Sequence, residues 1–391
     1  MSYILFDTEV RNQLLPFTHT RPVADIRCGI MTMRERWELL LNEKTFTITT
    51  RHLQEVYPSD EKGNGILINA SIFATKQLVD AVRELKPGEQ LISDNLFIAA
   101  NCMDEEGISI ENRINKTASY TKISFNETVF NLNRIWDIFT QNERAIKEDF
   151  VLLTAGKTSM TIPEFVTAIA PENIFIAEGA IVNPCIINAS TGPVYIEKQA
   201  EIMEGCMLRG PVALGKNAVL KMGAKVYGAT TIGEGCKVGG EVNNVVFFAN
   251  SNKGHDGFLG NAVIGEWCNL GADTNCSNLK NNYDIVKVWD EYENKLINTG
   301  MQFCGMMMGD HSKSGINTMF NTGTVVGVSC NVFGSSFPDK FIPSFSWGAA
   351  GETLIYDFDK AMETAERMME RRGIKLTDAQ RKMYQYIFDN K

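Results

Sequence analysis

Between Ile196 and Val242 the chain repeats its hydrophobic pattern every six residues. An aliphatic residue opens each unit, and a small or β-branched residue follows four positions later. The aliphatic positions are Ile196, Ile202, Leu208, Leu214, Leu220, Val226, Ile232 and Val238, and the small positions are Ala200, Cys206, Val212, Ala218, Ala224, Thr230, Cys236 and Val242. A period of six is neither helical nor that of a plain strand, and it indicates a solenoid in which three units close one triangular coil.

The pattern lapses at Asn243 and resumes at Ile264 and Leu270. It lapses again over the polar segment 280–300 and returns at four positions, Met308, Phe320, Val326 and Val332. Glycine often follows the aliphatic position, where a corner needs unusual dihedrals or close backbone approach; the examples are Gly215, Gly233, Gly239, Gly265 and Gly271. These features predict a left-handed parallel β-helix of hexapeptide repeats.

Four cysteines occupy small inward positions of the repeat: Cys206, Cys236, Cys268 and Cys330. We expect them to pack as small hydrophobic residues instead of serving as redox groups or ligands.

The two ends of the chain differ from the repeat. Residues 1–155 alternate strand-like segments (2–6, 45–50 and 65–70) with helix-like ones (31–43 and 75–85), which predicts an α/β domain. The β-helix domain is expected to span residues 156–357. Amphipathic segments 358–372 and 377–390, divided at Gly373, predict two helices in a C-terminal domain, 358–391, that caps the last coil.

Composition excludes several classes of protein. The net charge of −9 argues against a nucleic-acid surface, and no apolar run approaches the length of a membrane span. The N-terminus lacks the basic and apolar regions of a signal peptide. Nine cysteines without a C-x-x-C pair support neither a disulfide framework nor a zinc site. We therefore expect a cytoplasmic protein.

One of the four histidines, His255, lies where the repeat lapses and should project from the coil. When an amine attacks a thioester it loses a proton, and a base with a pKa of about 6.5–7 suits that step, which favours histidine. Backbone N–H groups of the glycine-rich coil are suited to stabilise the oxyanion. The alternatives are that His255 is a solvated loop residue, or that His311 projects outward and is the base.

Residues 254–274 fit the pattern G-H-x-x-[YF]-[LV]-G-[DN]-x-x-[IV]-G-x-x-x-N-x-G-A-x-T. Over about residues 194–335 the chain resembles the GlmU-like family of bifunctional sugar-1-phosphate uridylyltransferases and amino-sugar acetyltransferases. The resemblance implies the following roles: His255 as general base, Glu241 as the carboxylate that orients it, Asn269 near the acceptor sugar, Asn278 near the thioester, and Lys221 at the sugar phosphate. Lys280 and Lys287 are further candidates for binding acetyl-CoA.

The acceptor pocket departs from that family at two positions. Phe258 stands where the family has a tyrosine, and Asn243 stands where it has a lysine. Because a hydroxyl and a cation are missing, the identity of the amino sugar stays open, whereas the positions of the base and the thioester are intact.

The N-terminal segment 14–29 looks like the start of a nucleotidyltransferase, but the preceding loop, FDTEVRNQ, has no glycine. The position of the family's metal-binding aspartate carries Asn69 and Ala70. Any Mg²⁺ would therefore draw on Asp7 or Asp25. Phosphate contacts would come from Arg11, Arg21 and Arg27, since arginine suits phosphate oxygens. Nucleotidyl transfer, a sugar-nucleotide-binding remnant and a structural role all stay open.

The whole sequence predicts an acetyl-CoA-dependent N-acetyltransferase for an amino-sugar phosphate or sugar nucleotide, joined to a diverged nucleotidyltransferase domain. The competing hypotheses are a non-catalytic sugar-nucleotide-binding protein and a trimeric scaffold. A flat-faced solenoid predicts a homotrimer. Segment 280–300, with strand-like runs DIVKVWD and KLINTG, would then reach a neighbouring subunit.

Overall fold

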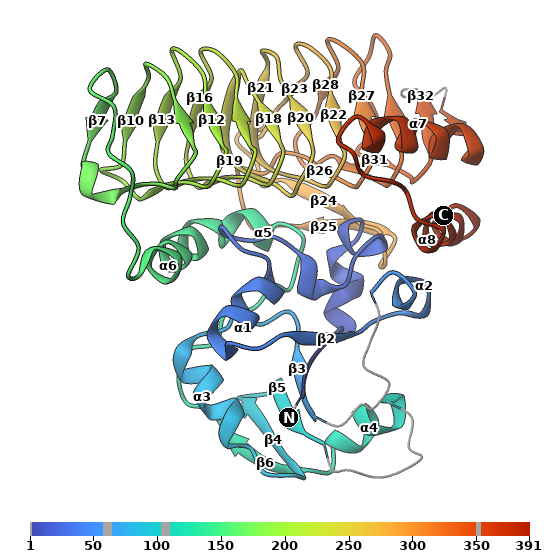
Figure 1. Cartoon of the computed structure of the whole chain (residues 1–391). Helices are drawn as coiled ribbons and strands as arrows, with labels where there is room; N and C mark the ends of the chain where they lie inside the picture. The colour runs from blue at the N-terminus through green and yellow to red at the C-terminus, as the bar shows by residue number, and fades with distance from the viewer. Residues whose placement is uncertain (1, 58–64, 103–109, 349–352) are drawn as a thin grey trace. The chain divides into compact units, whose positions relative to one another are not determined.

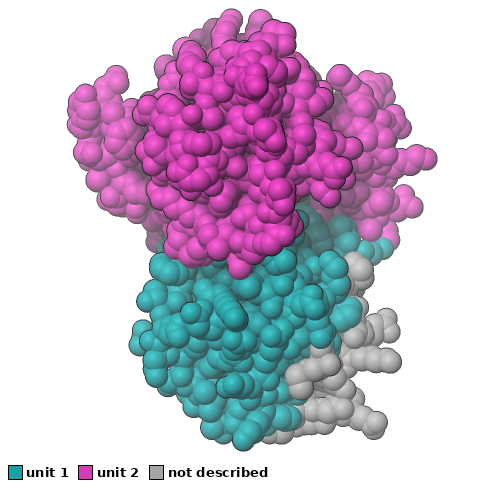
Figure 2. All heavy atoms as spheres, turned by 60° about the vertical axis from the view of Figure 1, so that its left-hand side comes forward, with its two compact units in different colours: residues 1–14, 20–26, 31–134 teal, residues 15–19, 27–30, 135–391 magenta. Residues whose placement is uncertain are grey.

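A computed structural model describes residues 2–57, 65–102, 110–348 and 353–391. The chain divides into two compact units, coloured separately in Figure 2. Unit 1 comprises residues 1–14, 20–26 and 31–134, and unit 2 comprises residues 15–19, 27–30 and 135–391. Segment 135–155, which the sequence assigns to the N-terminal domain, therefore belongs to the same unit as the repeats.

Unit 1 is an α/β domain built on a six-stranded mixed sheet of order β2-β1-β3-β5-β4-β6. Its strands are β1 (Ser2–Phe6), β2 (Thr45–Ile48), β3 (Gly65–Asn69), β4 (Glu89–Ser93), β5 (Leu96–Asn101) and β6 (Thr121–Ser124). Its helices are α1 (Met33–Leu41), α2 (Arg51–Gln54), α3 (Lys76–Glu84) and α4 (Ile110–Thr117). Only the pairings of β5 are antiparallel. The predicted α/β class, with its three strands and two helices, is confirmed.

Unit 2 is a parallel β-solenoid whose coils present three faces (Figure 1). Face A comprises β7 (Thr167–Ile169), β10 (Ile186–Asn188), β13 (Met207–Arg209), β16 (Lys225–Tyr227), the first halves of β19 (Glu241–Phe247) and β21 (Phe258–Ile264), β23 (Asn275–Cys276) and β28 (Met319–Phe320). Face B comprises β8 (Ile174–Ile176), β11 (Val194–Ile196), β14 (Val212–Leu214), β17 (Thr230–Ile232), the second halves of β19 and β21, β26 (Met307–Met308), β29 (Val325–Val326) and β31 (Phe341–Ile342).

Face C comprises β9 (Ile181–Val182), β12 (Glu201–Ile202), β15 (Val219–Leu220), β18 (Lys237–Val238), β20 (Asn252–Lys253), β22 (Asn269–Leu270), β27 (Lys313–Ser314), β30 (Asn331–Val332), β32 (Ser346–Gly348) and the antiparallel β33 (Leu354–Ile355). Segment 280–300 leaves the coil as a hairpin of β24 (Lys287–Asp290) and β25 (Lys295–Asn298), so both strand-like runs predicted there are confirmed.

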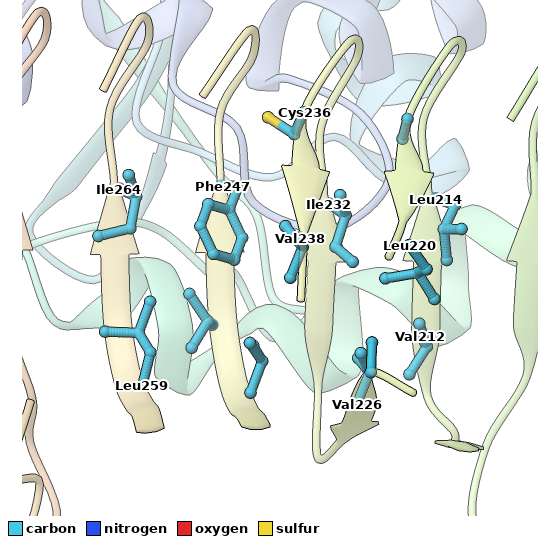
Figure 3. Close-up of a cluster of buried hydrophobic side chains, with 14 of the residues drawn as sticks. Val212, Leu214, Leu220, Val226, Ile232, Cys236, Val238, Phe247, Leu259 and Ile264 are labelled. Atoms are coloured by element: carbon cyan, nitrogen blue, oxygen red, sulfur yellow. The ribbon is translucent and has the colours of Figure 1, made fainter. Parts of the chain in front are cut away.

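The aliphatic positions of the repeat form the core, because each strand pairs in register with its equivalent in the next coil. Figure 3 shows these side chains stacked inside the solenoid, for example Leu214 beside Ile232 and Leu220 beside Val238. Cys206, Cys236, Cys268 and Cys330 are fully buried among them, as predicted, and burial raises the pKa of each thiol. The predicted fold class is confirmed.

The solenoid continues through residues 243–263, where the sequence predicts a lapse. Phe247, Lys253 and Leu259 occupy the inward positions there, in register with Ile232, Val238 and Val242. The hexapeptide pattern is lost because the unit from Val238 to Val242 is two residues short, because the units ending at Phe247 and Ile264 are each one residue short, and because one inward side chain is a lysine. The prediction of a break was therefore wrong.

Glycine at the corners is required by close backbone approach. A Cβ on Gly233 would lie 1.5 Å from the carbonyl oxygen of Phe248. These corner glycines do not adopt the left-handed backbone conformation. Other residues of the coil do so, such as Asn250 (φ 55°) and Trp267 (φ 59°). Of the two reasons predicted for these glycines, close approach is the correct one.

Helices cover two sides of the solenoid. Helix α5 (Asp137–Thr140) contacts β19 and β21, and α6 (Asn142–Thr154) packs on the outside of face B, where Phe150 and Leu153 meet Phe175 and Tyr195. The C-terminal helices, α7 (Phe358–Glu370) and α8 (Asp378–Asp389), confirm the predicted pair. None of the described helices is long and apolar enough to cross a bilayer.

The sequence predicts that helices α7 and α8 cap the last coil. In the structure they do more than this. They lie along the corner between faces B and C. Phe358 packs on Phe345, Tyr384 lies edge-on to His311, and the Arg372 guanidinium lies 6.0 Å from the ring of Trp267. These partners belong to successive coils, so the end of α7 reaches well back along the solenoid, near face C.

Candidate active site

His255 lies in a tight loop, residues 254–257, between β20 on face C and β21 on face A. Its side chain is exposed, as predicted, and makes no hydrogen bond to any other described residue. The two ends of the loop are held by the ladder, since Gly239 N donates to the carbonyl of Lys253 and Glu241 N donates to that of Gly257. The imidazole therefore projects from a short loop whose two ends are anchored to the ladder.

A hollow of about 480 Å³ opens on one side of His255. Its lining includes the exposed carboxylates of Asp256 and Asp273, together with Met203 and Met222 from earlier coils. Lys221 lines this hollow as well as the second one described below. This hollow, called here the acidic hollow, offers negative charge within reach of the imidazole.

A second hollow, of about 820 Å³, extends from His255 across face C to helix α7. Six cationic side chains and no carboxylate line it among the described residues; they are Lys221, Lys237, Lys313, Arg367, Arg371 and Arg372. In a chain of net charge −9, such a one-sided lining is unusual. We call this the basic hollow.

Three of the six cations are engaged within the protein. Arg372 donates to the Gly235 carbonyl and to Asn252 Oδ1 at 3.1 Å. Lys313 Nζ lies 2.6 Å from the His311 carbonyl oxygen, and burial lowers its pKa to about 8. Arg367 pairs with Glu363. Lys221, Lys237 and Arg371 form no ion pair with a described carboxylate, so their charge is available to a bound anion.

The structure brings together three residues that the sequence singles out. Lys221, His255 and Asn269 all line the basic hollow. They come from three different coils, and the register of β15, β18, β20 and β22 on face C aligns them.

Four other candidates lie on the outside of face A. Glu241 pairs in register with Phe258, and Asn243 pairs with Gly260. Asn278 bonds to Asn261 at 2.8 Å and lies close over Gly260. The carboxylate of Glu241 accepts a 2.7 Å hydrogen bond from the Tyr227 hydroxyl, which raises the pKa of Tyr227 to about 12. Among the described residues it has no hydrogen bond to His255, so its orienting role stays a prediction.

The remaining candidates of this domain lie elsewhere. Lys280 Nζ donates to the Ile285 carbonyl, and Lys287 is exposed on β24 in the hairpin segment. His311 is only 3% exposed, between Trp267 and Tyr384. The alternative in which His311 projects outward as the base is therefore wrong.

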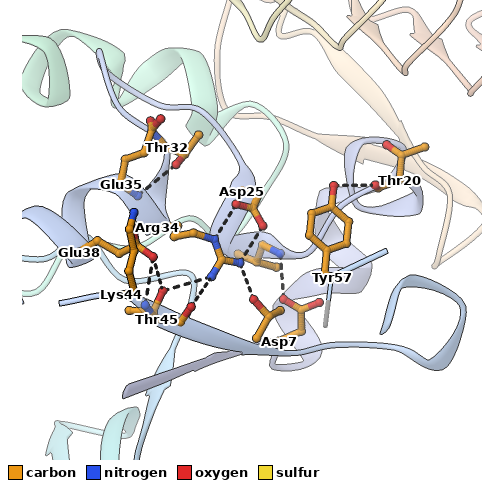
Figure 4. Close-up of polar contacts among 12 residues, drawn as sticks. Asp7, Thr20, Asp25, Thr32, Arg34, Glu35, Glu38, Lys44, Thr45 and Tyr57 are labelled. Carbon is orange, nitrogen blue, oxygen red and sulfur yellow. Dashed lines mark hydrogen bonds and ion pairs between the residues drawn. The ribbon is translucent and has the colours of Figure 1, made fainter. Parts of the chain in front are cut away.

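In unit 1, the position expected for a metal ligand is already occupied by protein contacts. Asn69 is buried; its Oδ1 accepts from the N–H and hydroxyl of Ser71, and its Nδ2 donates to the Phe97 carbonyl. Asp25 receives two 2.8 Å bonds from Arg34 (Figure 4). The described residues contain no group of three or more His, Cys, Asp or Glu side chains placed to hold a metal. The residues here do not fit a Mg²⁺ ion.

Asp7, the other candidate ligand, is also enclosed (Figure 4). It accepts from Thr49 Oγ1 at 2.6 Å and Val23 N at 2.8 Å, and Arg11 lies 3.6 Å away. Burial raises its pKa from 3.8 to about 6, against the lowering effect of those three partners.

The three candidate phosphate ligands are not a surface cluster. Arg11 and Arg21 are buried in unit 1, whereas Arg27 belongs to unit 2 and donates to the Ile30 carbonyl. The glycine-free loop forms a short 3₁₀ helix, Glu9–Leu14. Phosphate binding by these arginines stays a prediction.

Sequence reasoning missed the contribution of α7 to the basic hollow and the carboxylates of the acidic hollow. The sequence offered one signal, the run Arg367, Arg371 and Arg372 on one amphipathic segment, but nothing in it places that helix beside face C. Asp256 and Asp273 lie within the matched segment 254–274 at positions the pattern leaves variable.

Comparisons with known proteins agree with this architecture. A family model described as sugar nucleotidyl transferase matches residues 3–158. A Sulfurisphaera tokodaii protein, named bifunctional sugar-1-phosphate nucleotidylyltransferase/acetyltransferase, is 32% identical over 82% of this chain and 93% of its own length. The chain belongs to the GlmU-like family. This confirms the resemblance, and the chain is a transferase.

Two further comparisons cover less of this chain. The bifunctional protein GlmU of Methanocaldococcus jannaschii is 31% identical over 30% of this chain and only 28% of its own length. A solved putative acetyltransferase from Bacillus cereus is 10% identical, with a TM-score of 0.27, over 58% of this chain and 98% of its own. The substrates of this GlmU-like protein therefore do not follow from the names of its relatives.

We predict that Asp7 makes unit 1 less stable as the pH rises from about 4 to about 6. In that range the folded state holds the proton that the unfolded state releases, so stability is greatest at the acid end and falls by an amount on the order of 3 kcal/mol. Hydrogen exchange of peptides from β1 and β3 at pH 4 and 6.5, corrected for intrinsic rates, measures this. Asp7→Asn should remove the difference, and Asp94→Asn, an exposed matched control, should keep it. A wild-type protection independent of pH contradicts the prediction.

Proposed function

We propose that this chain is an acetyl-CoA-dependent N-acetyltransferase that acts on an amino-sugar phosphate or a sugar nucleotide. The observation that carries the proposal is the position of His255, whose exposed side chain lines both the acidic and the basic hollow. Membership of a family of nucleotidyltransferase/acetyltransferases supports acyl transfer as the reaction class.

In the proposed reaction, the amine nitrogen attacks the thioester carbonyl carbon while His255 takes the amine proton. The tetrahedral intermediate then expels the thiolate as the amide forms, and the imidazolium returns the proton to the sulfur. One residue thus serves as base and then as acid, and no protein nucleophile is needed. The solvent-exposed imidazole, free of other hydrogen bonds among the described residues, is available for both transfers.

The two hollows match the charges of such a substrate pair. An amine that is protonated in water is attracted to Asp256 and Asp273 and must then lose its proton to become a nucleophile. Phosphate groups fit the basic hollow, where Lys221, Lys237 and Arg371 offer charge that no described carboxylate neutralises. A ligand that carries both an amine and a phosphate would bridge the two hollows past His255.

The other candidates complete the proposed site. Asn269 lines the basic hollow and is assigned to the acceptor sugar. Phe258 and Asn243 shape the acceptor side on face A, and Asn278, Lys280 and Lys287 are assigned to acetyl-CoA. The last three lie in or at the root of the segment that leaves the coil, where they would serve a ligand held between subunits.

We expect His255→Ala to lower the acetyl-transfer rate by roughly 10²–10⁴-fold, the usual contribution of a general base. Binding of acetyl-CoA should hardly change. Glu241→Gln should cost less, since the role proposed for Glu241 is only to orient and polarise the imidazole. Thiol release measures the rates, with His52→Ala in unit 1 as the matched control. A His255→Ala enzyme with wild-type turnover contradicts the assignment.

Reversing one charge in the basic hollow should weaken substrate binding more than turnover. We expect Arg371→Glu to raise KM for the phosphorylated substrate by roughly tenfold, equivalent to about 1.4 kcal/mol, with kcat nearly unchanged. The effect should shrink at high salt because the contact is partly solvated. Lys375→Glu, which changes an exposed cation outside the hollow, is the control. Equal effects of the two variants would show that the hollow does not bind the anion.

We also propose a homotrimer in which face A meets the neighbouring subunits. Faces B and C are partly covered by α6 and α7, whereas face A exposes apolar side chains, among them Ile186 (43%), Met207 (44%) and Met319 (38%). Lys225 and Glu241 interrupt this outward row after Met207. Exposed apolar side chains gathered on one face still favour an interaction surface, and homo-oligomers usually close by rotation. Glu241 and Phe258 lie in the same outward row as Met207, so the neighbour would complete the site beside His255.

Light scattering at micromolar concentration should give three times the mass of one chain. Met207→Lys should dissociate the trimer, because it places an unpaired charge in the apolar interface. Val151→Lys, on the exposed side of α6, should leave the mass unchanged. A monomeric wild type would rule the assembly out.

The second proposal concerns unit 1, which we infer has weak or absent nucleotidyltransferase activity. Asn69 is fully used by protein contacts, and Asp7 and Asp25 are paired with arginines. For unit 1 the same observations favour the alternative of a sugar-nucleotide-binding remnant. That hypothesis predicts nucleotide binding without pyrophosphate release.

We expect little or no pyrophosphate release when the chain is given a nucleoside triphosphate and a sugar-1-phosphate, with or without Mg²⁺. The physical reason is that no described carboxylate cluster is available to bind the metal and no glycine loop is available to approach the triphosphate. A coupled phosphate assay measures the rate. Turnover at an ordinary rate of about 1–10³ s⁻¹ would show that this unit is a complete enzyme.

A further inference from the structure

A lysine occupies a core position of the solenoid directly before the His255 loop. The inward row of face C consists of aliphatic or small side chains except at this coil; its members are Ile202, Leu220, Val238, Lys253, Leu270, Ser314 and Val332. Lys253 is 1% exposed and pairs in register with Val238. An aliphatic side chain would fill the same place without the cost of desolvating an ammonium group.

The buried amine is directed at the loop that carries the imidazole. Lys253 Nζ donates to the His255 carbonyl oxygen at 2.9 Å and to the Gly239 carbonyl oxygen at 3.2 Å. Gly240 makes room for it: with φ at +70°, a Cβ there would lie 2.8 Å from Nζ and 2.9 Å from the His255 carbonyl oxygen. The local backbone is thus shaped around a bond between the core and the loop.

The loop has little stiffness of its own. Glycines flank the His255–Asp256 pair, and Gly257 adopts a φ of +114°, which few other residues reach. No heavy atom lies within 4 Å of where a Gly254 Cβ would be, so that side of the loop is open. Between the ladder bonds at its two ends, the Asp256 carbonyl accepts from Asp273 N at 3.1 Å, and the Lys253 amine holds the His255 carbonyl from the core side.

Nearby carboxylates offset only part of the effect of burial on the pKa of the Lys253 amine. Burial lowers the pKa of Lys253 from 10.5 to about 8, while Asp256 and Asp273 oppose that shift. Both carboxylates belong to the acidic hollow, so the amine, the loop and the hollow form one electrostatic unit.

We propose that Lys253 is a positioning residue for the acyl-transfer site: its buried amine holds the His255 carbonyl and so fixes where the imidazole stands between the two hollows. This inference rests on the proposed role of His255 as the general base. Lys253 touches neither substrate nor reacting atoms; it acts through the backbone of His255. Displacement of a catalytic group by about 1 Å is enough to cost on the order of 10²-fold in rate.

The test replaces the amine with an apolar side chain of similar length, Lys253→Met. The core position accepts an aliphatic residue in other coils, so we expect the folded, oligomeric state and its thermal stability to be kept or raised. The kcat for acetyl transfer should fall by 10- to 100-fold, with KM for acetyl-CoA within about twofold. Leu220→Met, two coils earlier in the same inward row and outside the lining of both hollows, is the matched control and should leave kcat unchanged.

A second readout does not depend on turnover. The NMR signal of the His255 imidazole and the rate of its modification by diethyl pyrocarbonate report the placement of the loop. Both should change in Lys253→Met and stay as in the wild type in Leu220→Met. If the folded variant keeps the wild-type signal and modification rate, or a kcat within about twofold of wild type, the proposal is overturned.

Parallel measurement of His255→Ala separates this inference from the proposed function. If His255→Ala retains turnover, the proposed base is wrong, and the NMR and modification rates still decide whether Lys253 holds the loop. If His255→Ala is inactive and Lys253→Met is fully active, only the positioning role fails. Lys253→Leu, which repeats the side chain of Leu220 and Leu270, is used if the methionine variant does not fold. Failure of both to fold would show a purely structural lysine and would also overturn the proposal.

Discussion

The stacking of inward side chains from coil to coil is the constraint on which the rest of the structure depends. Each strand pairs in parallel register with its equivalent in the next coil, so an aliphatic residue such as Leu220 packs against Val238. A register shift of one residue would turn the inward side chains of that strand to the outside. The same register sets the outward rows. It brings Lys221, His255 and Asn269 to one hollow although they come from three coils.

The candidate site uses the points where this regularity is relaxed. Lys253 stands in the inward row at the coil whose corner loop carries His255. Helix α7, which comes after the last coil in sequence, turns back along the B–C corner and adds Arg371 to the outer surface of face C. The regular core, the buried Lys253 and the basic helix α7 thus combine to place both carboxylates and cations in hollows that the His255 imidazole lines.

Sequence reasoning predicted the solenoid, the α/β unit and the C-terminal helices because each depends on local periodicity. It read a break at 243–263, since shortened units and the buried Lys253 hide a core that continues through Phe247 and Leu259. It could not place α7 beside face C, because contacts such as Arg372 with Asn252 join residues 120 positions apart. The ion pairs of Asp7 with Arg11 and of Asp25 with Arg34 join residues only four and nine positions apart, but they form across turns that the hydrophobic pattern does not predict.

The central claim is that the corner of His255 transfers an acetyl group to a phosphorylated amino sugar. The most direct measurement is thiol release from acetyl-CoA by the wild-type chain against a panel of sugars that vary in the free amine and the phosphate. The account predicts release with at least one sugar that carries both groups, and none with its N-acetylated or dephosphorylated forms. Absence of release with every amino-sugar phosphate and sugar nucleotide, or release that does not require an amine, would contradict it.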